Sequence, residues 1–287
     1  MKSIILIFGA NGQLGQSLKS IVANQKLDFF DFIFLPKEDS DITNFILLTK
    51  VFKKYSPNYI INCAAYTQVD LAEDFKDEAY SINVIGVKNI ATLCKKFHST
   101  FIHLSTDFVF EGNKTLILNE KDTCSPINYY GLSKLQGEEE IKKTIEEHFI
   151  VRTSWLYSEF SNNFVTTMLR LGKEKDSLNV VNDQIGTPTY AVDLARFIIN
   201  LIEAESLKYG VYHYSNEGVS SWYDFAKAIF EYTNNSIKVN PVSSTEFKTK
   251  AKRPSFSVLD KTKTKTNLNT EIKHWRESLK ECLKKIK

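Results

Sequence analysis

The sequence predicts an α/β protein, with a doubly wound parallel sheet of the Rossmann type and a smaller C-terminal substrate-binding lobe. Three observations support this fold class. Short apolar runs alternate with helical patterns through the first half of the chain, and these runs lack the polar alternation of half-exposed strands. A glycine-rich turn joins the first run to the first helical pattern. Strands that are apolar on both sides belong to parallel sheets covered by helices on both faces.

The predicted elements of the first half follow one another in strict alternation. The strands cover residues 4–8, 32–35, 59–63, 100–104 and 149–152. The helical patterns cover residues 13–25, 43–55, 78–97 and 129–147. Because crossovers between parallel strands are nearly always right-handed, this order predicts one sheet with helices on both faces.

After residue 153 the alternation becomes irregular. Helices are predicted at 163–174, 190–204, 221–234 and 274–286, and strands at 178–181 and 211–214. We assign residues 1–153 to a dinucleotide-binding domain, to which 183–214 returns. We assign 154–182 and 215–287 to the smaller substrate-binding lobe.

Composition excludes several classes of protein. The 287 residues are 43% hydrophobic and 25% charged, which is typical of globular proteins, and the net charge of +3 is too small to indicate nucleic-acid binding. A secretory signal and a membrane-spanning run are both absent, so we expect a cytoplasmic protein that does not bind a membrane. The four cysteines lack Cys-x-x-Cys spacing and predict neither zinc nor disulfides.

Gly9, Gly12 and Gly15 lie directly after the first predicted strand and at the start of a helix. In this context the first glycine permits a tight turn, the second lets backbone N–H groups approach a pyrophosphate, and the third lets helix and strand pack closely. The loop therefore predicts a nicotinamide dinucleotide. Lys37, at the end of the second strand, either pairs with a 2′-phosphate, which favours NADPH over NADH, or is a solvated loop residue.

Tyr130 and Lys134 are spaced to share one face of a helix. A nearby ammonium lowers the pKa of a phenol toward the working range, which predicts Tyr130 as an acid–base group. Thr106 ends the fourth strand, at the sheet edge where ligands bind, and its hydroxyl can orient the same carbonyl oxygen. Tyr-x-x-x-Lys alone is common on helix surfaces, so this prediction depends on the position of the pair after that strand.

Several ordered segments carry a family resemblance over nearly the whole chain. They are residues 9–15, 62–70, 105–110, 130–134, 152–157, 163–164, 183–189, 253–254 and 259–260. Together they resemble the dTDP-4-dehydrorhamnose reductases, within the extended short-chain dehydrogenase/reductase superfamily. The resemblance implies reduction of dTDP-4-dehydro-L-rhamnose by NADPH or NADH, giving dTDP-L-rhamnose for a cell-surface polysaccharide.

The resemblance also implies roles for individual residues. The catalytic set would be Thr106, Tyr130 and Lys134. The cofactor would contact Gly9, Asn11, Gly12, Gln13, Leu14, Gly15, Lys37, Asp41, Ile42, Ala64, Ala65 and Tyr66, besides Tyr130 and Lys134. The sugar nucleotide would contact Thr67, Val69, Thr106, Asp107, Phe108, Trp155, Asn163 and Arg253.

The chain departs from the family pattern in two places. Phe108 stands where the family usually has tyrosine, which leaves the exact sugar open. Some relatives dimerise through a metal held by a carboxylate on the first helix, but Gln16 and Ser17 occupy that region here, so we expect no metal. A homodimer remains compatible with the sequence.

Other interpretations apply to several of these residues. Trp155 could be a core residue, Asp107 a turn residue, and the lysines at 248–253 and 261–265 a solvated surface. The five histidines lack metal-ligand spacing and are interpreted as structural or exposed.

Two other functions remain open. One is a reductase or epimerase of another nucleotide-linked 4-keto-6-deoxy sugar. The other is a non-catalytic NADP-binding regulatory subunit. A dehydratase is disfavoured, because related dehydratases have an acidic pair after the threonine, whereas Asp107 is followed by Phe108.

Overall fold

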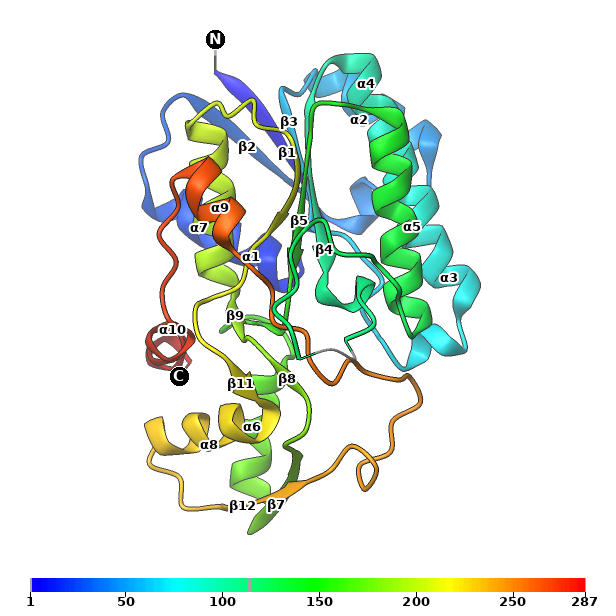
Figure 1. Ribbon diagram of the computed structural model, residues 1–287. Helices are drawn as coiled ribbons and strands as arrows, with labels where there is room; N and C mark the ends of the chain where they lie inside the picture. Colours follow the sequence, from blue (N-terminus) through cyan, green and yellow to red (C-terminus); the bar gives the residue numbers. More distant parts are fainter. Residues whose placement is uncertain (1, 113–114, 287) are drawn as a thin grey trace.

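The computed structural model describes residues 2–112 and 115–286, and its centre is a six-stranded sheet (Figure 1). The strands lie in the order β10-β5-β4-β3-β1-β2, and every neighbouring pair is parallel. Their bounds are β1 (Ser3–Phe8), β2 (Phe30–Leu35), β3 (Tyr59–Asn62), β4 (Thr100–Thr106), β5 (His148–Thr153) and β10 (Gly210–His213). This confirms the predicted doubly wound parallel sheet.

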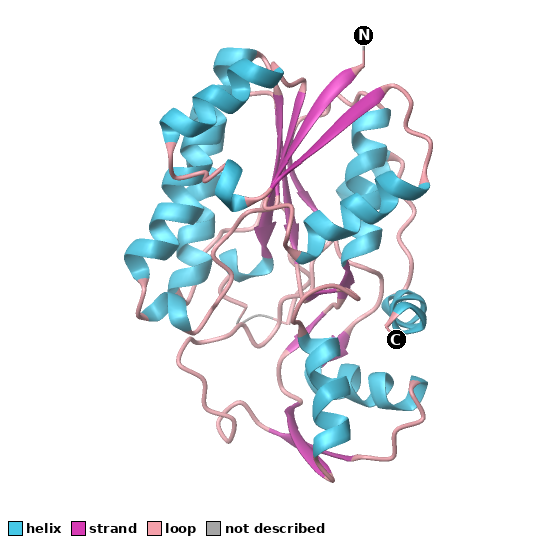
Figure 2. Ribbon diagram, turned by 180° about the vertical axis from the view of Figure 1, so that it is seen from behind, coloured by secondary structure: helices cyan, strands magenta, loops and turns pink. Residues whose placement is uncertain are grey.

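Helices cover both faces of the sheet, as Figure 2 shows from behind. One face carries α1 (Gln13–Asn24) and α7 (Ala191–Glu203), and the other carries α2 (Phe45–Tyr55), α4 (Val87–Phe97) and α5 (Tyr129–Thr144). Alternate residues of β1 enter the two cores: Ile5 and Ile7 on the α1 side, and Leu6 and Phe8 on the other. Burial on both faces explains why this strand is continuously apolar.

The strand order places a switch point between β1 and β3. From β1 the chain passes outward to β2 on one side, then returns to β3 and continues through β4 and β5 on the other. The loops after β1 and β3 therefore diverge at the carboxyl edge of the sheet, which leaves a crevice where ligands bind in such folds.

The helix predicted at 78–97 is interrupted. It consists of α3 (Lys76–Tyr80), a π-helical turn (Ser81–Gly86) and α4. The turn carries Asn83, whose side chain binds the backbone of Tyr66 at 2.9 and 3.1 Å and the hydroxyl of Ser133 at 2.9 Å. These contacts join distant segments, so the local pattern could not reveal the wider turn.

The smaller lobe lies beyond the carboxyl edge of the sheet (Figure 1). Helices α6 (Phe164–Glu174) and α8 (Trp222–Tyr232) pack against each other and beside a parallel pair, β7 (Ser177–Val181) and β12 (Lys238–Val242). Two short pairs connect this region to the main sheet: β6 (Leu156–Tyr157) with β9 (Thr189–Tyr190), and β8 (Ile185–Gly186) with β11 (Ser220–Ser221).

Near the C-terminus, α10 (Trp275–Lys285) packs on α8 and β9. The sequence did not predict α9 (Thr262–Leu268), which lies against β10 and therefore beside the main sheet, although 215–287 was assigned to the smaller lobe. Its contacts are polar: Thr264 donates to the carbonyl of His213 at 2.6 Å, and Lys263 to that of Val211 at 2.7 Å. A helix bound through hydroxyls and lysines has no apolar stripe for a sequence pattern to detect.

Among the helices of residues 2–112 and 115–286, none is both long and apolar enough to span a membrane.

Candidate active site

The glycine loop has the close approaches that its spacing predicts. Gly9 has φ +73°, and a Cβ there would lie 2.6 Å from the backbone nitrogen of Ala64. A Cβ on Gly15 would lie 2.6 Å from the carbonyl oxygen of Gly9. At Gly12 the helix α1 begins with neither a side-chain cap nor an acidic residue in its first turn. Its first N–H groups are therefore open to an anion, as the pyrophosphate of a dinucleotide requires.

A cavity of about 640 Å³ opens at the carboxyl edge of the sheet beside this loop. The predicted site residues that line it are Gly12, Gln13, Leu14, Ala65, Thr67, Val69, Thr106, Asp107, Phe108, Tyr130, Lys134, Trp155, Asn163 and Arg253. One cavity thus joins the start of α1 to the ends of β4 and α5. An uncapped helix start next to a threonine, tyrosine and lysine set fits a nicotinamide dinucleotide, with its pyrophosphate at the glycine loop.

The other predicted cofactor residues do not line this cavity. They are Gly9, Asn11, Gly15, Lys37, Asp41, Ile42, Ala64 and Tyr66. Lys37 is exposed in the turn after β2. Asp41 accepts two bonds from Thr43, at 2.9 and 2.8 Å, and Ile42 is buried beneath Gly86. Asp41 and Ile42 thus hold the loop that follows β2.

Thr106 and Asp107 mark the end of β4, and both are buried. The Thr106 hydroxyl accepts from the backbone N–H of Phe108 at 3.2 Å and donates to the carboxyl of Asp107 at 3.1 Å. Burial raises the pKa of Asp107 to about 6, against the opposing effect of the Ser257 and Thr106 hydroxyls. The strand end therefore presents a hydroxyl backed by a buried carboxyl, whose raised pKa brings its titration closer to neutral pH.

Tyr130 lies at the start of α5, where Asn128 caps the helix by accepting from the N–H of Gly131 at 2.8 Å. The ring of Phe108 packs edge-on against it, with centroids 5.7 Å apart. Burial raises the pKa of Tyr130 to about 12, whereas the sequence predicted that the lysine would lower it. The reason is burial of the phenol, to which the nearby charge of Asp107 adds and which the hydroxyl of Thr106 opposes. Tyr130 is therefore a neutral phenol at neutral pH, which is the form that can donate a proton.

Lys134 lies one helical turn beyond Tyr130 and is 2% exposed. Its Nζ donates to the carbonyl of Leu104 at 2.6 Å and lies 3.2 Å from Nε2 of His103, on the neighbouring strand β4. Burial lowers the pKa of Lys134 to about 8, although the carboxylate of Glu138 acts in the opposite direction. The spacing placed Lys134 on the correct helix face, but the histidine contact was not predicted.

A buried ion pair lies deeper in the same interface. Arg152 on β5 donates to both oxygens of Glu138, at 2.9 and 2.7 Å, and Ser105 donates to one of them at 2.5 Å. Both charged side chains are at most 2% exposed. The pair fixes α5 against β4 and β5, and so fixes the height of Tyr130 and Lys134 above the sheet.

On the substrate side, Trp155 has φ +46° and stacks on Trp222, with ring centroids 3.6 Å apart. Sequence reasoning missed Trp222, because it lies in α8, far along the chain. Asn163 lines the cavity, but its amide caps α6, accepting from Val165 at 3.0 Å and donating to the carbonyl of Ser158 at 2.8 Å.

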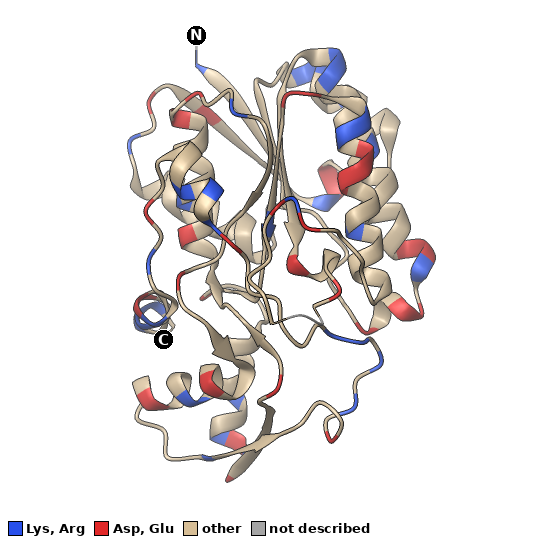
Figure 3. Cartoon of the chain, viewed as in Figure 1, with Lys and Arg blue, Asp and Glu red and all other residues tan. Residues whose placement is uncertain are grey.

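Arg253 reaches the cavity from a segment of the smaller lobe. Its guanidinium donates to both oxygens of Asp70, at 3.1 and 2.6 Å. Arg253 ends the basic stretch 248–253, which runs along the outside of the lobe (Figure 3), where Lys250 forms an ion pair with Asp74.

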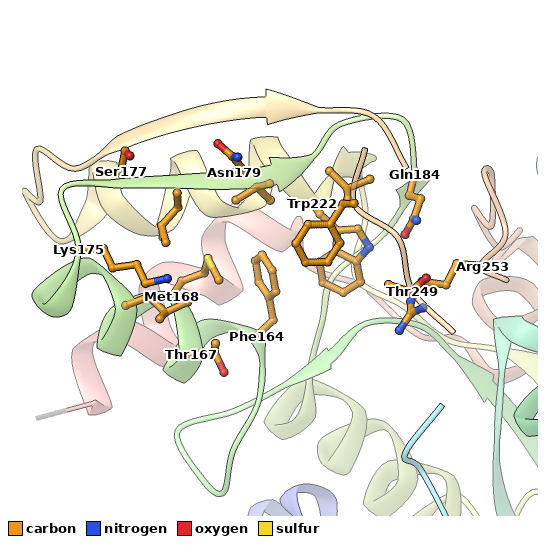
Figure 4. A pocket seen from close by; sticks show the side chains of 15 residues that line it. Phe164, Thr167, Met168, Lys175, Ser177, Asn179, Gln184, Trp222, Thr249 and Arg253 are labelled. Atoms are coloured by element: carbon orange, nitrogen blue, oxygen red, sulfur yellow. The ribbon is translucent and has the colours of Figure 1, made fainter. Parts of the chain in front are cut away.

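A second cavity, also about 640 Å³, lies within the smaller lobe and shares Trp222 and Arg253 with the first. Figure 4 shows Phe164, Met168 and Trp222 along its wall, Arg253 at one end and Lys175 at the other. An apolar wall with cationic ends is suited to a flat ring attached to a phosphate.

Comparison with known proteins finds similar chains over nearly the whole length of this one. The family described as "RmlD substrate binding domain" matches residues 1–287. The dTDP-4-dehydrorhamnose reductase of Aggregatibacter actinomycetemcomitans is 42% identical, with 96% of this chain and 97% of that protein covered. The spore coat polysaccharide biosynthesis protein SpsK of Bacillus subtilis (strain 168) is 39% identical, with 97% and 96% covered. The crystal structure of dTDP-4-dehydrorhamnose reductase from Bacillus anthracis str. Ames in complex with NADP is similar with a TM-score of 0.94, 42% identity and 99% of each chain covered.

Proposed function

Because the chain belongs to the RmlD substrate binding domain family, we propose that it reduces the 4-keto group of dTDP-4-dehydro-L-rhamnose with NADPH, giving dTDP-L-rhamnose for polysaccharide biosynthesis. The observation that carries this function is the meeting of Thr106, Tyr130 and Lys134 with the open start of α1 around one cavity. A nicotinamide and a keto group have to meet at such a set for reduction.

Each residue has a distinct part in the reaction. When bound, NADPH supplies the hydride that the carbonyl carbon accepts. Tyr130 donates its phenolic proton to the carbonyl oxygen, and its raised pKa keeps that proton in place until the oxygen becomes basic. The Thr106 hydroxyl orients the same oxygen. Lys134 balances the negative charge that develops on Tyr130 as its proton leaves.

The second cavity supports a site for the nucleotide half of the substrate. Trp222 and Arg253 belong to both cavities, so one substrate can place its sugar beside Tyr130 and its thymine against Phe164 and Met168. The diphosphate would then pass Arg253. With this assignment, the dinucleotide-binding domain comprises residues 1–153 and 183–214. The substrate lobe comprises residues 154–182 and 215–287, except for α9, which packs beside the main sheet.

The test follows the loss of NADPH absorbance when the protein receives dTDP-4-dehydro-L-rhamnose. We expect Tyr130→Phe to lower kcat by about 10²–10⁴-fold, because the proton donor is lost, with the Kd for NADPH unchanged. Tyr129→Phe is the matched control, because Tyr129 is the preceding residue on α5 and does not line the cavity. Tight NADPH binding without oxidation would refute this reductase and favour an epimerase or a regulatory subunit.

A further inference from the structure

We propose that Asn62 and His103 set the charge of Lys134, through a chain of hydrogen bonds that starts at the backbone N–H of Ala64. Both are positioning residues that act through Lys134. Only the consequence for proton transfer rests on the function proposed above. The hydrogen-bond chain can be tested without any activity.

The orientation of Asn62 is fixed at its oxygen, because Oδ1 accepts from the N–H of Ala64 at 3.1 Å. The amide nitrogen therefore faces the imidazole of His103, with Nδ2 and Nδ1 3.2 Å apart. An amide NH₂ only donates, so Nδ1 of His103 has to accept. Burial lowers the pKa of His103 well below its usual value, so the ring is neutral and carries its single proton on Nε2.

The proton on Nε2 points toward Lys134. Nε2 and Nζ lie 3.2 Å apart, and Nζ also has to donate to the carbonyl of Leu104, at 2.6 Å. A neutral amine meets both demands, donating one proton and accepting with its lone pair. An ammonium has three donors and no acceptor, so it would place one N–H against another.

The conflict cannot be removed without losing another bond. With the opposite tautomer of His103, an N–H of the ring would face the NH₂ of Asn62. Rotating Asn62 by half a turn would leave the N–H of Ala64 without its acceptor. The three buried groups therefore favour the neutral amine of Lys134.

Other charged groups near Lys134 do not reverse this preference for its neutral amine. Glu138, one turn along α5, favours the ammonium, but both its oxygens are bound by Arg152 of β5. Asp107 and Tyr130 border the same cavity from the end of β4 and the start of α5. With a pKa of about 8, Lys134 can therefore bind and release a proton near neutral pH at the edge of the cavity.

The first experiment measures the tautomer of His103 by NMR on ligand-free protein labelled with ¹⁵N-histidine. Its signal is identified by its loss in His103→Phe. We expect protonated Nε2 and unprotonated Nδ1 at about pH 9, where the ring is neutral and Lys134, with a pKa of about 8, is mostly a neutral amine. A proton on Nδ1 in the native protein would overturn the proposal, whether or not the protein reduces a sugar.

The second experiment uses Asn62→Asp, whose carboxylate accepts from both Ala64 and His103. The His103 tautomer should reverse, so that Nε2 accepts from the ammonium of Lys134. We expect the pKa of Lys134 to rise by about one unit or more. It is followed by the ¹³C signal of its ε-carbon, which is assigned through Lys134→Met.

The added negative charge of the introduced carboxylate requires a control. The same substitution in a His103→Phe background retains the direct attraction between that carboxylate and Lys134, but lacks the ring that transmits the tautomer change. We expect a smaller shift of the Lys134 pKa in that background. Equal shifts in both backgrounds would overturn the role of His103.

Discussion

At the scale of single residues, Asp107 is the clearest source of pH dependence. Its pKa in the folded protein, about 6, lies above its ordinary value of 3.8, so the folded state binds this proton more tightly than the unfolded state does. The stability that the protonated carboxyl of Asp107 contributes below about pH 4 is therefore lost as the pH rises through about 6.

Asp107→Asn should remove this loss. Asparagine keeps an oxygen that can accept from Thr106 but cannot ionise. We expect the free energy of unfolding at pH 8 to rise by about 1–3 kcal/mol, measured by urea denaturation. The gain should shrink at pH 4, where the native carboxyl is already protonated, and a gain that does not change with pH would contradict the explanation.

The buried pair of Glu138 and Arg152 leads to a second prediction at this scale. Arg152→Met removes both hydrogen bonds that the guanidinium gives to the buried carboxylate and leaves Lys142, 3.6 Å away, as its cation, and we expect a loss of about 3–5 kcal/mol in the free energy of unfolding at pH 7. Burial raises the pKa of Glu138, but the bonds from Arg152 and Ser105 hold it below its ordinary value of 4.5. The pair therefore stabilises the fold above that value and ceases to do so as the pH falls below it.

The matched control is the double variant Glu138→Met with Arg152→Met, which removes both charges. It should recover a large part of the lost stability in the same urea experiment, because apolar side chains of similar size can replace a buried pair. A double variant no more stable than Arg152→Met alone would show that packing, and not charge, is responsible.

Sequence reasoning reached some of these residues and missed others for a physical reason. Tyr130 and Lys134 lie one helical turn apart, and Thr106 follows a recognisable strand, so local spacing places all three. His103 and Glu138 matter because β4 packs under α5. That packing is a tertiary contact, and a single sequence has no periodicity that encodes it.

At the scale of elements, the start of α6 joins stability to substrate binding. Asn163 caps the helix in a capping box with Thr166 and also holds the loop that lines the cavity. We expect Asn163→Ala to lower the free energy of unfolding by about 1–2 kcal/mol and to raise the KM for the sugar nucleotide, with the Kd for NADPH unchanged. Urea denaturation and initial rates measure these effects.

Asn44→Ala is the control for capping alone. Asn44 caps α2 by accepting from the N–H of Leu47 at 3.0 Å, and it does not line either cavity. It should lower stability by a similar amount without changing the KM. If both variants raised the KM equally, the effect would reflect general loosening of the fold and not the loop at the cavity.

Elements could be predicted where their pattern is apolar. The buried strands β1, β3 and β4 and the amphipathic helices α1 and α7 lie within a few residues of their predicted positions. The π-helical turn at 81–86 and α9 were missed, since one depends on Asn83 bridging to Tyr66 and Ser133 and the other on polar contacts with β10. In both cases tertiary hydrogen bonds, and not local propensity, determine the structure.

At the scale of the whole molecule, two cavities meet at the boundary between the sheet and the smaller lobe. Arg253 binds Asp70 and Lys250 binds Asp74, so the segment 248–254 of the lobe is joined to the loop after β3 by ion pairs. Trp155, which follows β5, stacks on Trp222 of α8 across the same boundary. A substrate that fills both cavities therefore contacts both parts of the protein.

The two ligands should accordingly protect different segments from hydrogen exchange. NADPH should slow exchange in residues 9–15 and 130–137, and dTDP in residues 164–184, because each ligand orders the backbone around its own cavity. Trp222→Ala should weaken the protection by dTDP and leave most of the protection by NADPH, because Trp222 belongs to α8 of the smaller lobe and the glycine loop to the main domain. Protection by dTDP confined to residues 9–15 would place the nucleotide in the dinucleotide cavity and refute the assignment of the lobe to the substrate.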